Sequence, residues 1–456
     1  MPAERNKGSM DMKKAHKFLS AMIAALFVMT ALSVTVSDNG TDAGEDEAVG
    51  AAGDWKTVST GWEFTVAVKS DGSLWAWGKN DVGQLGLGDT DDRHVPTQIG
   101  SATDWATVSA GMEHALAIKT TGELYAWGVN DKAQLGLGDH IDRDVPTQVG
   151  TANDWAMVSA GSYHTAAIKT DGTLWIWGYN TSSGYLGLGV PASYIKSPAK
   201  ITSVGDNWKM VSAGYRYTAA IKTTGELYAW GFNDKGQIGD GTTVDKTSPT
   251  RIEPTIDWAT VSAGDYAHTM AITTTGKLYT WGLNDKGQLG DNTLINKTSP
   301  IQIGSATDWA AVSASSEHSA AVKTTGELYT WGRNDKGQLG TGDTSDKKTP
   351  TQVTSPSVDW AMVSAGGLFT AAISDTGELY VWGYNQSGQI GDGTYGFGTS
   401  KSTPTLIEAP PTVGGPGGGG GTGSGDGISM VLIIAIVAAI AVVAAVAVYF
   451  LVIRKR

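Results

Sequence analysis

The sequence contains no cysteine, which excludes disulfide bonds, thiolate metal ligands and cysteine nucleophiles. Phenylalanine is also scarce, with 7 residues against 17 tryptophans and 61 glycines in a chain of 456. No helical hydrophobic period persists through the central part, where short β-prone runs lie between glycines. These features predict a β-rich protein with many turns in place of a helical core.

Sequence motifs of common catalytic sites are missing as well. The chain has no phosphate-binding loop, no zinc-binding helix motif and no nucleophile elbow between a strand and a helix. The acidic loop 88–92 lacks the spaced oxygen ligands of a known calcium loop, so a solvated loop is the preferred interpretation. We therefore expect no catalytic residue, no metal site, no cofactor and no enzymatic activity.

The C-terminal region carries 26 consecutive residues without a charge, at positions 428–453. About 20 such residues are enough to cross a bilayer as a helix, so this segment is predicted to be a transmembrane helix. Residues 454–456 are all basic, which favours a cytoplasmic C-terminus. Residues 410–427 are rich in glycine and are expected to form a flexible linker before the helix.

The N-terminal residues 1–37 have the order of a secretion signal, with basic residues followed by an apolar stretch from Phe18 to Val36. The segment is either cleaved as a signal peptide or retained as a signal anchor. The acidic residues 38–53 are expected to be disordered. Both alternatives predict a cell-membrane protein with its body outside, crossing once, or twice if the signal is retained.

The body between these ends is acidic. Residues 38–426 contain 25 Lys and Arg against 43 Asp and Glu, a balance that should repel nucleic acid. We therefore expect no nucleic-acid partner. Four Asn-x-Ser/Thr patterns are possible glycosylation sites in an exported protein; they begin at Asn39, Asn180, Asn296 and Asn385.

Residues 54–409 consist of seven repeats of 50 to 53 residues. The second repeat shows four short β segments with turns between them, at 104–119, 122–128, 130–139 and 146–149. Four strands in about 50 residues make one blade of a propeller. The sequence thus predicts an all-β, seven-bladed β-propeller with four-stranded blades.

Fourteen tryptophans mark this repeat and are interpreted as blade-packing residues. Seven follow Asp or Asn: Trp55, Trp105, Trp155, Trp208, Trp258, Trp309 and Trp360. Seven precede Gly: Trp77, Trp127, Trp177, Trp230, Trp281, Trp331 and Trp382. Three departures from the pattern predict local distortion without a change of fold, namely Ala133 and Ser315 in place of glycine, and Tyr185 in place of glutamine.

Two recurring motifs resemble a known family. Residues 127–138 read Trp-Gly-x-Asn-x-x-x-Gln-Leu-Gly-x-Gly and residues 158–165 read Val-Ser-Ala-Gly-x-x-His-Thr, as in the repeat of the regulator of chromosome condensation. The resemblance covers all seven units and implies a seven-bladed ring. In that family a blade conventionally begins at the Leu-Tyr-x-Trp-Gly strand. Residues 54–69 would then complete the last blade, begun at Glu378, and both chain ends would form a clasp.

Four histidines share one slot of the repeat: His114, His164, His268 and His318. Such a set could suggest metal ligands or general bases. Other units place Phe64, Tyr217 and Phe369 in the same slot. A position that accepts phenylalanine favours packing and hydrogen bonding over catalysis.

The candidate binding residues lie where the units differ, after each Ser-Ala-Gly-like turn. Equivalent blades would project these positions from one rim, and aromatic residues with arginine are typical of binding hot spots. The residues predicted to bind are Trp62, Glu63, Met112, Glu113, Tyr163, Tyr215, Arg216, Tyr266 and Glu317. Ordinary loop variation on a solvated face is the alternative interpretation.

Four functions are compatible with these patterns. The first is a membrane-anchored, cell-surface module that binds an extracellular protein or glycan through variable loops. The second, implied by the best-known member of the family, is guanine-nucleotide exchange on a small GTPase. The third is a propeller enzyme acting at the channel mouth, and the fourth is a structural component of the cell envelope.

Overall fold

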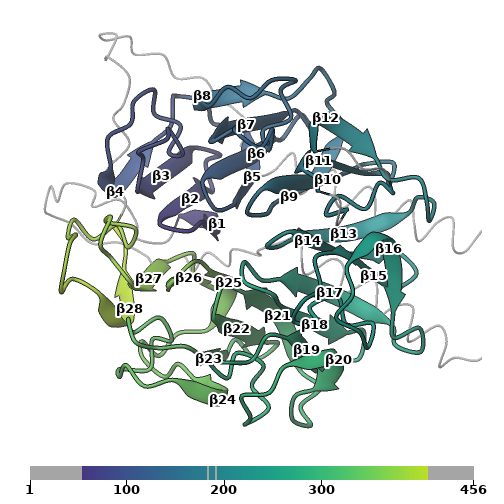
Figure 1. Cartoon of the computed structure of the whole chain (residues 1–456). Coiled ribbons are helices and arrows are strands. Elements are labelled where there is room, and N and C mark those ends of the chain that lie inside the picture. The colour runs from purple at the N-terminus through teal and green to yellow at the C-terminus, as the bar shows by residue number, and fades with distance from the viewer. Residues whose placement is uncertain (1–53, 182–183, 190–192, 409–456) are drawn as a thin grey trace, which may run out of the picture. The chain divides into compact units, whose positions relative to one another are not determined.

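The computed structural model describes residues 54–181, 184–189 and 193–408, which form seven four-stranded antiparallel sheets arranged around a central axis (Figure 1). The predicted all-β, seven-bladed propeller is confirmed. The predicted signal, acidic segment, glycine-rich linker, membrane helix and basic end lie outside the described residues. Within the described ranges, no helix is long and apolar enough to cross a membrane.

Each blade contains one repeat, and its four strands follow one another in the sheet. The first strands are β1 (Trp55–Thr60), β5 (Trp105–Ala110), β9 (Trp155–Ala160), β13 (Trp208–Ala213), β17 (Trp258–Ala263), β21 (Trp309–Ala314) and β25 (Trp360–Ala365). The second strands are β2 (Phe64–Lys69), β6 (His114–Lys119), β10 (His164–Lys169), β14 (Tyr217–Lys222), β18 (His268–Thr273), β22 (His318–Lys323) and β26 (Phe369–Ser374).

The third strands are β3 (Leu74–Gly78), β7 (Leu124–Gly128), β11 (Leu174–Tyr179), β15 (Leu227–Gly231), β19 (Leu278–Gly282), β23 (Leu328–Gly332) and β27 (Leu379–Gly383). The fourth strands are β4 (Arg93–Gln98), β8 (Arg143–Gln148), β12 (Tyr194–Lys200), β16 (Lys246–Ile252), β20 (Lys297–Gln302), β24 (Lys347–Gln352) and β28 (Lys401–Leu406). The first strands of adjacent blades contact one another near the axis, and the fourth strands form the outer edge (Figure 1).

Burial follows this order of strands. The second strand of each blade is buried along almost its whole length, as in β10, because neighbouring blades cover both of its faces. The fourth strand is partly exposed and carries polar residues. The core therefore lies between the blades, in seven clusters of buried apolar side chains that repeat around the ring.

Tryptophans hold neighbouring blades together. All fourteen repeated tryptophans are buried, and those of the third strands are fully so. The indole Nε1 of Trp177 donates to the main-chain oxygen of Gln134 in the preceding blade, at 2.9 Å. A Cβ at Gly136 would lie 2.6 Å from this Nε1, so only glycine allows the loop to approach the indole.

The expected clasp is wrong. Strand β1 pairs with β2 in the first sheet, and the last sheet is complete with β25 to β28. The physical reason is that each repeat supplies all four strands of its own blade. Strand β4 therefore completes the first blade and β28 completes the last. No strand in the described residues is exchanged between the first and last blades.

A ring of hydrogen bonds closes the propeller instead. In each blade the serine of the first strand accepts a main-chain N–H from the first strand of the next blade, as when Ala263 N donates to Ser212 Oγ at 2.9 Å. The same bond recurs at Ser59, Ser109, Ser159, Ser262 and Ser313. The seventh bond joins Thr60 N to Ser364 Oγ at 3.0 Å, and the two hydroxyls lie 2.8 Å apart.

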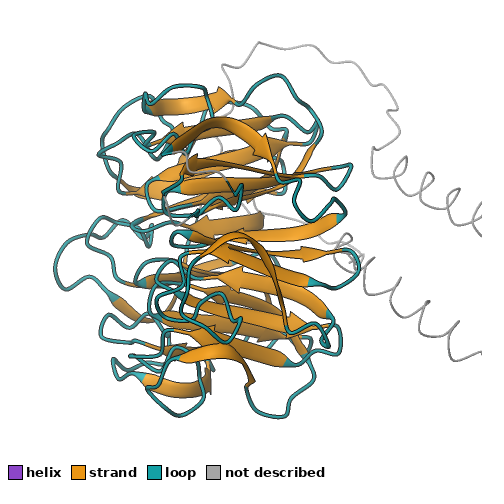
Figure 2. Ribbon diagram, turned by 45° about the vertical axis from the view of Figure 1, so that its right-hand side comes forward, coloured by secondary structure: helices purple, strands orange, loops and turns teal. Residues whose placement is uncertain are grey.

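Both ends of the described propeller lie at the same edge of their blades. The main-chain oxygen of Asp54 accepts from Ser70 N, next to the turn that joins β2 and β3. Ile407 N donates to the oxygen of Leu379 at the start of β27, on the same side. We call this side the turn face, and the side with the β1–β2 type turns and β3–β4 type loops the loop face; both edges are seen in Figure 2.

The contribution of the bonds that close the ring to the stability of the protein can be tested at Ser364. Ser364→Ala should lower the free energy of unfolding by about 2 kcal/mol, because it removes two hydrogen bonds with Thr60. The matched Ser212→Ala variant loses one such bond and should lose about 1 kcal/mol. Urea unfolding followed by tryptophan fluorescence measures both, and equal losses would contradict a special role for the closing pair.

Candidate functional site

The predicted rim positions lie in the first turn of each blade, on the loop face. Neighbouring turns are joined around the ring; Tyr215 N donates to the oxygen of Gly264 at 3.2 Å, for example. The fifth blade differs from the others because its turn contains three residues, 265–267, where the fourth blade has two. Ala267 therefore takes the place of Arg216 in accepting the N–H that follows the third strand.

A cluster of tyrosines surrounds Arg216. Its guanidinium carbon lies 4.7 Å from the ring centre of Tyr215, 5.5 Å from that of Tyr163 and 5.9 Å from that of Tyr185. All three distances fall within the range of cation–π attraction. Tyr266 extends the cluster, 6.3 Å from Tyr215, and is 49% exposed. The structure thus brings together four of the predicted residues, from blades three, four and five.

Arg216 differs from the other arginines of the described residues. Arg93, Arg143, Arg251 and Arg333 each form an ion pair with an acidic side chain. Arg216 forms none within the described part of the chain, and its buried Nε has no hydrogen-bond partner there. Its φ of 59° lies in the left-handed region, which is uncommon for a residue other than glycine.

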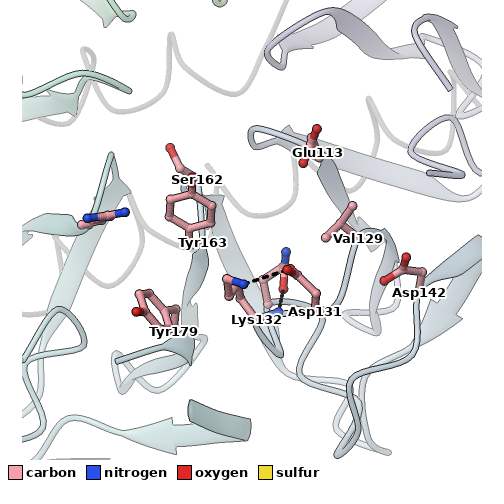
Figure 3. Close-up of a pocket in the computed structure, with 10 residues that line it drawn as sticks. Glu113, Val129, Asp131, Lys132, Asp142, Ser162, Tyr163 and Tyr179 are labelled. Atoms are coloured by element: carbon pink, nitrogen blue, oxygen red, sulfur yellow. Dashed lines mark hydrogen bonds and ion pairs between the residues drawn. The ribbon is translucent and has the colours of Figure 1, made fainter. Parts of the chain in front are cut away.

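A pocket of about 510 Å³ opens beside this cluster, between the second, third and fourth blades (Figure 3). Its lining residues from the second blade are Glu113, Val129, Asp131, Lys132, Gln134 and Asp142. The lining residues from the next two blades are Ser162, Tyr163, Tyr179 and Arg216. One wall is therefore mainly acidic, and the opposite wall is aromatic with one guanidinium.

The charges of the acidic wall are not equivalent. Asp131 pairs with Lys132 at 2.8 Å, and Asp142 accepts from Asn130 N at 2.7 Å. Glu113 forms no ion pair among the described residues, and burial raises its carboxyl pKa above the usual value. Glu113 is thus a partly desolvated carboxylate that would gain from a cationic partner.

The remaining predicted residues lie in other parts of the rim. Burial raises the pKa of Glu63, which lies near Lys79 on the first blade. Glu317 forms an ion pair with Arg333, which also binds Asp335 at 2.7 Å. Trp62 adjoins the turn of the last blade, and Met112 is partly buried. The rim is therefore divided into acidic, aromatic and ion-paired sections.

Several pocket residues were missed by the sequence prediction, namely Val129, Asp131, Lys132, Asp142 and Tyr179. They belong to the third strand or to the loop that follows it, whereas the prediction considered only the first turn of each blade. A signal was present, because the residue after Trp-Gly varies among the blades as the rim residues do. It is Lys79, Val129, Tyr179, Phe232, Leu283, Arg333 or Tyr384.

The four repeated histidines lie in the interior, at the seams between blades. His164 Nε2 lies 2.8 Å from Thr218 Oγ1 of the next blade, and the other three make equivalent bonds. Burial lowers the pKa of His164 to about 4 and that of the others to about 3. Ser315 Oγ and His318 Nδ1 are 2.7 Å apart, but both residues are fully buried and inaccessible to a substrate.

These buried histidines predict acid sensitivity. Because the folded pKa of His164 is about 4 and the ordinary value is 6.5, the unfolded chain takes up this proton first as the pH falls. The stability associated with neutral His164 is present above pH 6.5 and is lost as the pH falls towards 4. The loss at pH 4.5 should be roughly 2 kcal/mol for this histidine.

Urea unfolding of His164→Phe at pH 7 and pH 4.5 tests this prediction. The variant should be less stable at pH 7, because the bond to Thr218 is lost, and the difference from the wild type should shrink by roughly 2 kcal/mol at pH 4.5. His140→Phe is the control, because His140 is exposed on a loop. An unchanged difference between the two pH values would contradict the prediction.

Burial corrects two of the possible glycosylation sites. Asn180 and Asn385 are fully buried, and their side-chain oxygens accept the main-chain N–H groups of Leu186 and Ile390. A glycan cannot be attached to these side chains in the folded domain. Asn296 is exposed, although its side-chain oxygen accepts Asn284 N, and Asn39 lies outside the described residues.

Comparison with known proteins agrees with the repeat and the fold. The family described as the RCC1-like domain matches residues 150–423, and the regulator of chromosome condensation (RCC1) repeat matches residues 71–118 and 121–168. A second RCC1 repeat family matches residues 55–84 and 105–134. Fold and repeats define a propeller of RCC1 repeats. The chain belongs to the RCC1-like domain family.

Two curated relatives show how much of each protein is shared. The Arabidopsis thaliana ultraviolet-B receptor UVR8 is 32% identical over 356 residues, covering 78% of this chain and 58% of UVR8. The probable human E3 ubiquitin-protein ligase HERC6 is 31% identical over 234 residues, covering 50% of this chain and 18% of HERC6. The chain thus spans less than two thirds of the length of these relatives.

Solved structures show the same fold at low sequence identity. Human WBSCR16 has a TM-score of 0.66 at 20% identity, with 74% of this chain and 94% of that chain covered. Prp20p from Saccharomyces cerevisiae has a TM-score of 0.63 at 19% identity, with 79% and 89% covered. At these identities the likeness concerns the fold alone.

Proposed function

We propose that the chain is a non-catalytic interaction module, anchored in the cell membrane and displayed outside, that binds a protein or glycan through its loop face. The observation that carries this proposal is the arrangement of variable residues on a constant scaffold. Tyr163, Tyr215, Arg216 and Tyr266 gather on the loop face, where aromatic residues and arginine are typical binding hot spots.

The relatives support a role in protein recognition. One structure of Prp20p is described with its binding properties to Gsp1p and histones, and another shows Kap60 bound to yeast RCC1 (Prp20). UVR8 is named as a receptor. These are properties of those proteins, and a rigid propeller with variable loops suits comparable tasks with other partners.

The position of the chain ends supports display of the loop face. Asp54 and Ile407 both lie at the turn face, so a tether formed by residues 410–427 would start from the side opposite to the tyrosine cluster. The uncharged segment 428–453 is long enough to span a bilayer, and the apolar stretch 18–36 follows basic residues as in secretion signals. A membrane anchor would therefore leave the loop face accessible to an extracellular partner.

Protease treatment of intact cells tests the proposed location. The propeller should be digested from outside without lysis, while a fragment containing residues 428–456 is protected, and mass spectrometry should identify it. A cytoplasmic protein serves as the control for cell integrity. If the propeller is protected until lysis, display is excluded and nucleotide exchange on an intracellular GTPase becomes the function to measure.

Site-specific photocrosslinking tests which face binds. A photoreactive phenylalanine analogue at position 266, on the loop face, should give discrete crosslinked products on intact cells. The same analogue in place of Thr121, which is exposed on the turn face, should give none. Products that form only from position 121, or equally from both, would contradict the assignment of the loop face.

A further inference from the structure

The pocket between the second and fourth blades contains a guanidinium that the described residues leave without an anion. Arg216 is stacked among Tyr163, Tyr185 and Tyr215, which restrict its position, and no carboxylate of the described chain lies within ion-pair distance. Its Nε is shielded from water and has no hydrogen-bond partner among the described residues. A planar guanidinium held in this way suits two parallel hydrogen bonds to a carboxylate or phosphate.

Arg333 lies on the same face, and its charge is paired. It occupies the rim of the sixth blade and is neutralised by Glu317 and Asp335. Tyrosine rings surround the guanidinium of Arg216, whereas carboxylates surround that of Arg333. Within the described residues no carboxylate forms an ion pair with Arg216, so any anionic partner of this guanidinium lies outside the described part of the protein.

The wall opposite Arg216 has the reverse charge. Glu113 and Asp142 project from the second blade across from Tyr163 and Tyr179 in Figure 3. Glu113 forms no ion pair among the described residues; Lys79 of the first blade acts on it only at longer range, because its ammonium pairs with Asp81, and Lys132 is paired with Asp131. Within the described residues the pocket is thus dipolar, with Glu113 outside any ion pair on one side and Arg216 outside any ion pair on the other.

We infer that this pocket binds an extended segment of a protein partner that carries one acidic and one basic side chain, with the acidic carboxylate on Arg216 and the basic group facing Glu113. Tyr163 and Tyr179 offer flat apolar surface to the segment between the two charges. Glu113 and Asp142 of the second-blade wall would repel a doubly charged phosphate more strongly than a singly charged carboxylate, which favours a carboxylate on the partner. This inference rests on the proposed binding function of the loop face.

Peptide selection provides the test. A phage-displayed library of random 12-residue peptides is selected against the purified full chain, and the enriched sequences are synthesised with blocked ends. The expected sequences combine Asp or Glu with Lys or Arg a few positions away. Replacing the acidic residue of the best peptide by its amide should weaken binding about tenfold or more, as measured by calorimetry.

The Arg216→Gln variant should bind the parent peptide more weakly by a similar factor. The same variant should bind the acidic peptide and its amide form with equal affinity. This loss of discrimination separates direct contact from a general structural effect. Arg216→Lys should restore part of the affinity, because it keeps the charge without the planar fork. Arg251→Gln is the matched control, since Arg251 lies in the same blade and pairs with Glu226.

The outcomes distinguish this inference from the proposed function. Peptides that bind Arg216→Gln as well as the wild type, or that carry no acidic residue, would overturn the inference while leaving the loop face as a binding surface. Tighter binding of a phosphoserine form would overturn the choice of carboxylate. The absence of any enriched peptide would also overturn the inference. If the analogue at position 266 gives no crosslinked product on intact cells, that result counts against the proposed function itself.

Discussion

The interaction on which the propeller depends is the hydrogen bond between a buried tryptophan and the loop of the preceding blade. Trp177 donates to the main-chain oxygen of Gln134, and the bond recurs in six of the seven blades of the described structure. A hydrogen bond to a buried indole N–H is directional, so each of these six tryptophans fixes the position of a neighbouring loop. Because these loops form the loop face, the packing that stabilises the ring also holds the binding surface rigid.

The exception lies beside the candidate site. Tyr185 replaces the glutamine in the third blade, and Trp230 of the fourth blade has no hydrogen-bond partner for its Nε1 among the described residues. The ring of Tyr185 instead lies 5.9 Å from the guanidinium carbon of Arg216. The hydrogen bond from tryptophan to the preceding loop, which joins the other blades, is thus missing at the seam where Tyr185 takes part in the tyrosine cluster.

The sequence was sufficient for the fold because packing repeats once per blade. Trp127 and Trp177 recur at fixed intervals and require the same environment, so the period gives both the number of blades and the buried residues. The order of strands within a blade could not be read from the period, because a repeat has no intrinsic first strand. The clasp was consequently wrong. The pairing of β1 with β2 in the first sheet decides that order in the folded protein.

The site was predicted in part for a related reason. Tyr163, Tyr215 and Arg216 stood out because their positions vary in a repeated turn. Tyr179 and Lys132 belong to another segment of the repeat, and their approach to the first turns depends on how the strands of one blade pair. Asn180 and Asn385 show the same limit, since an acceptor pattern contains no information about burial.

The unclasped ring has a consequence for how such a chain can change. Each described blade is formed by one repeat, and the connections between blades lie on the turn face, the same face as both described ends. A circular permutation that opened the chain before Asp104 would leave all seven sheets intact, because no sheet contains strands from two repeats. Duplication or loss of a repeat would likewise add or remove all four strands of one blade. The number of repeats in the sequence therefore determines the number of blades.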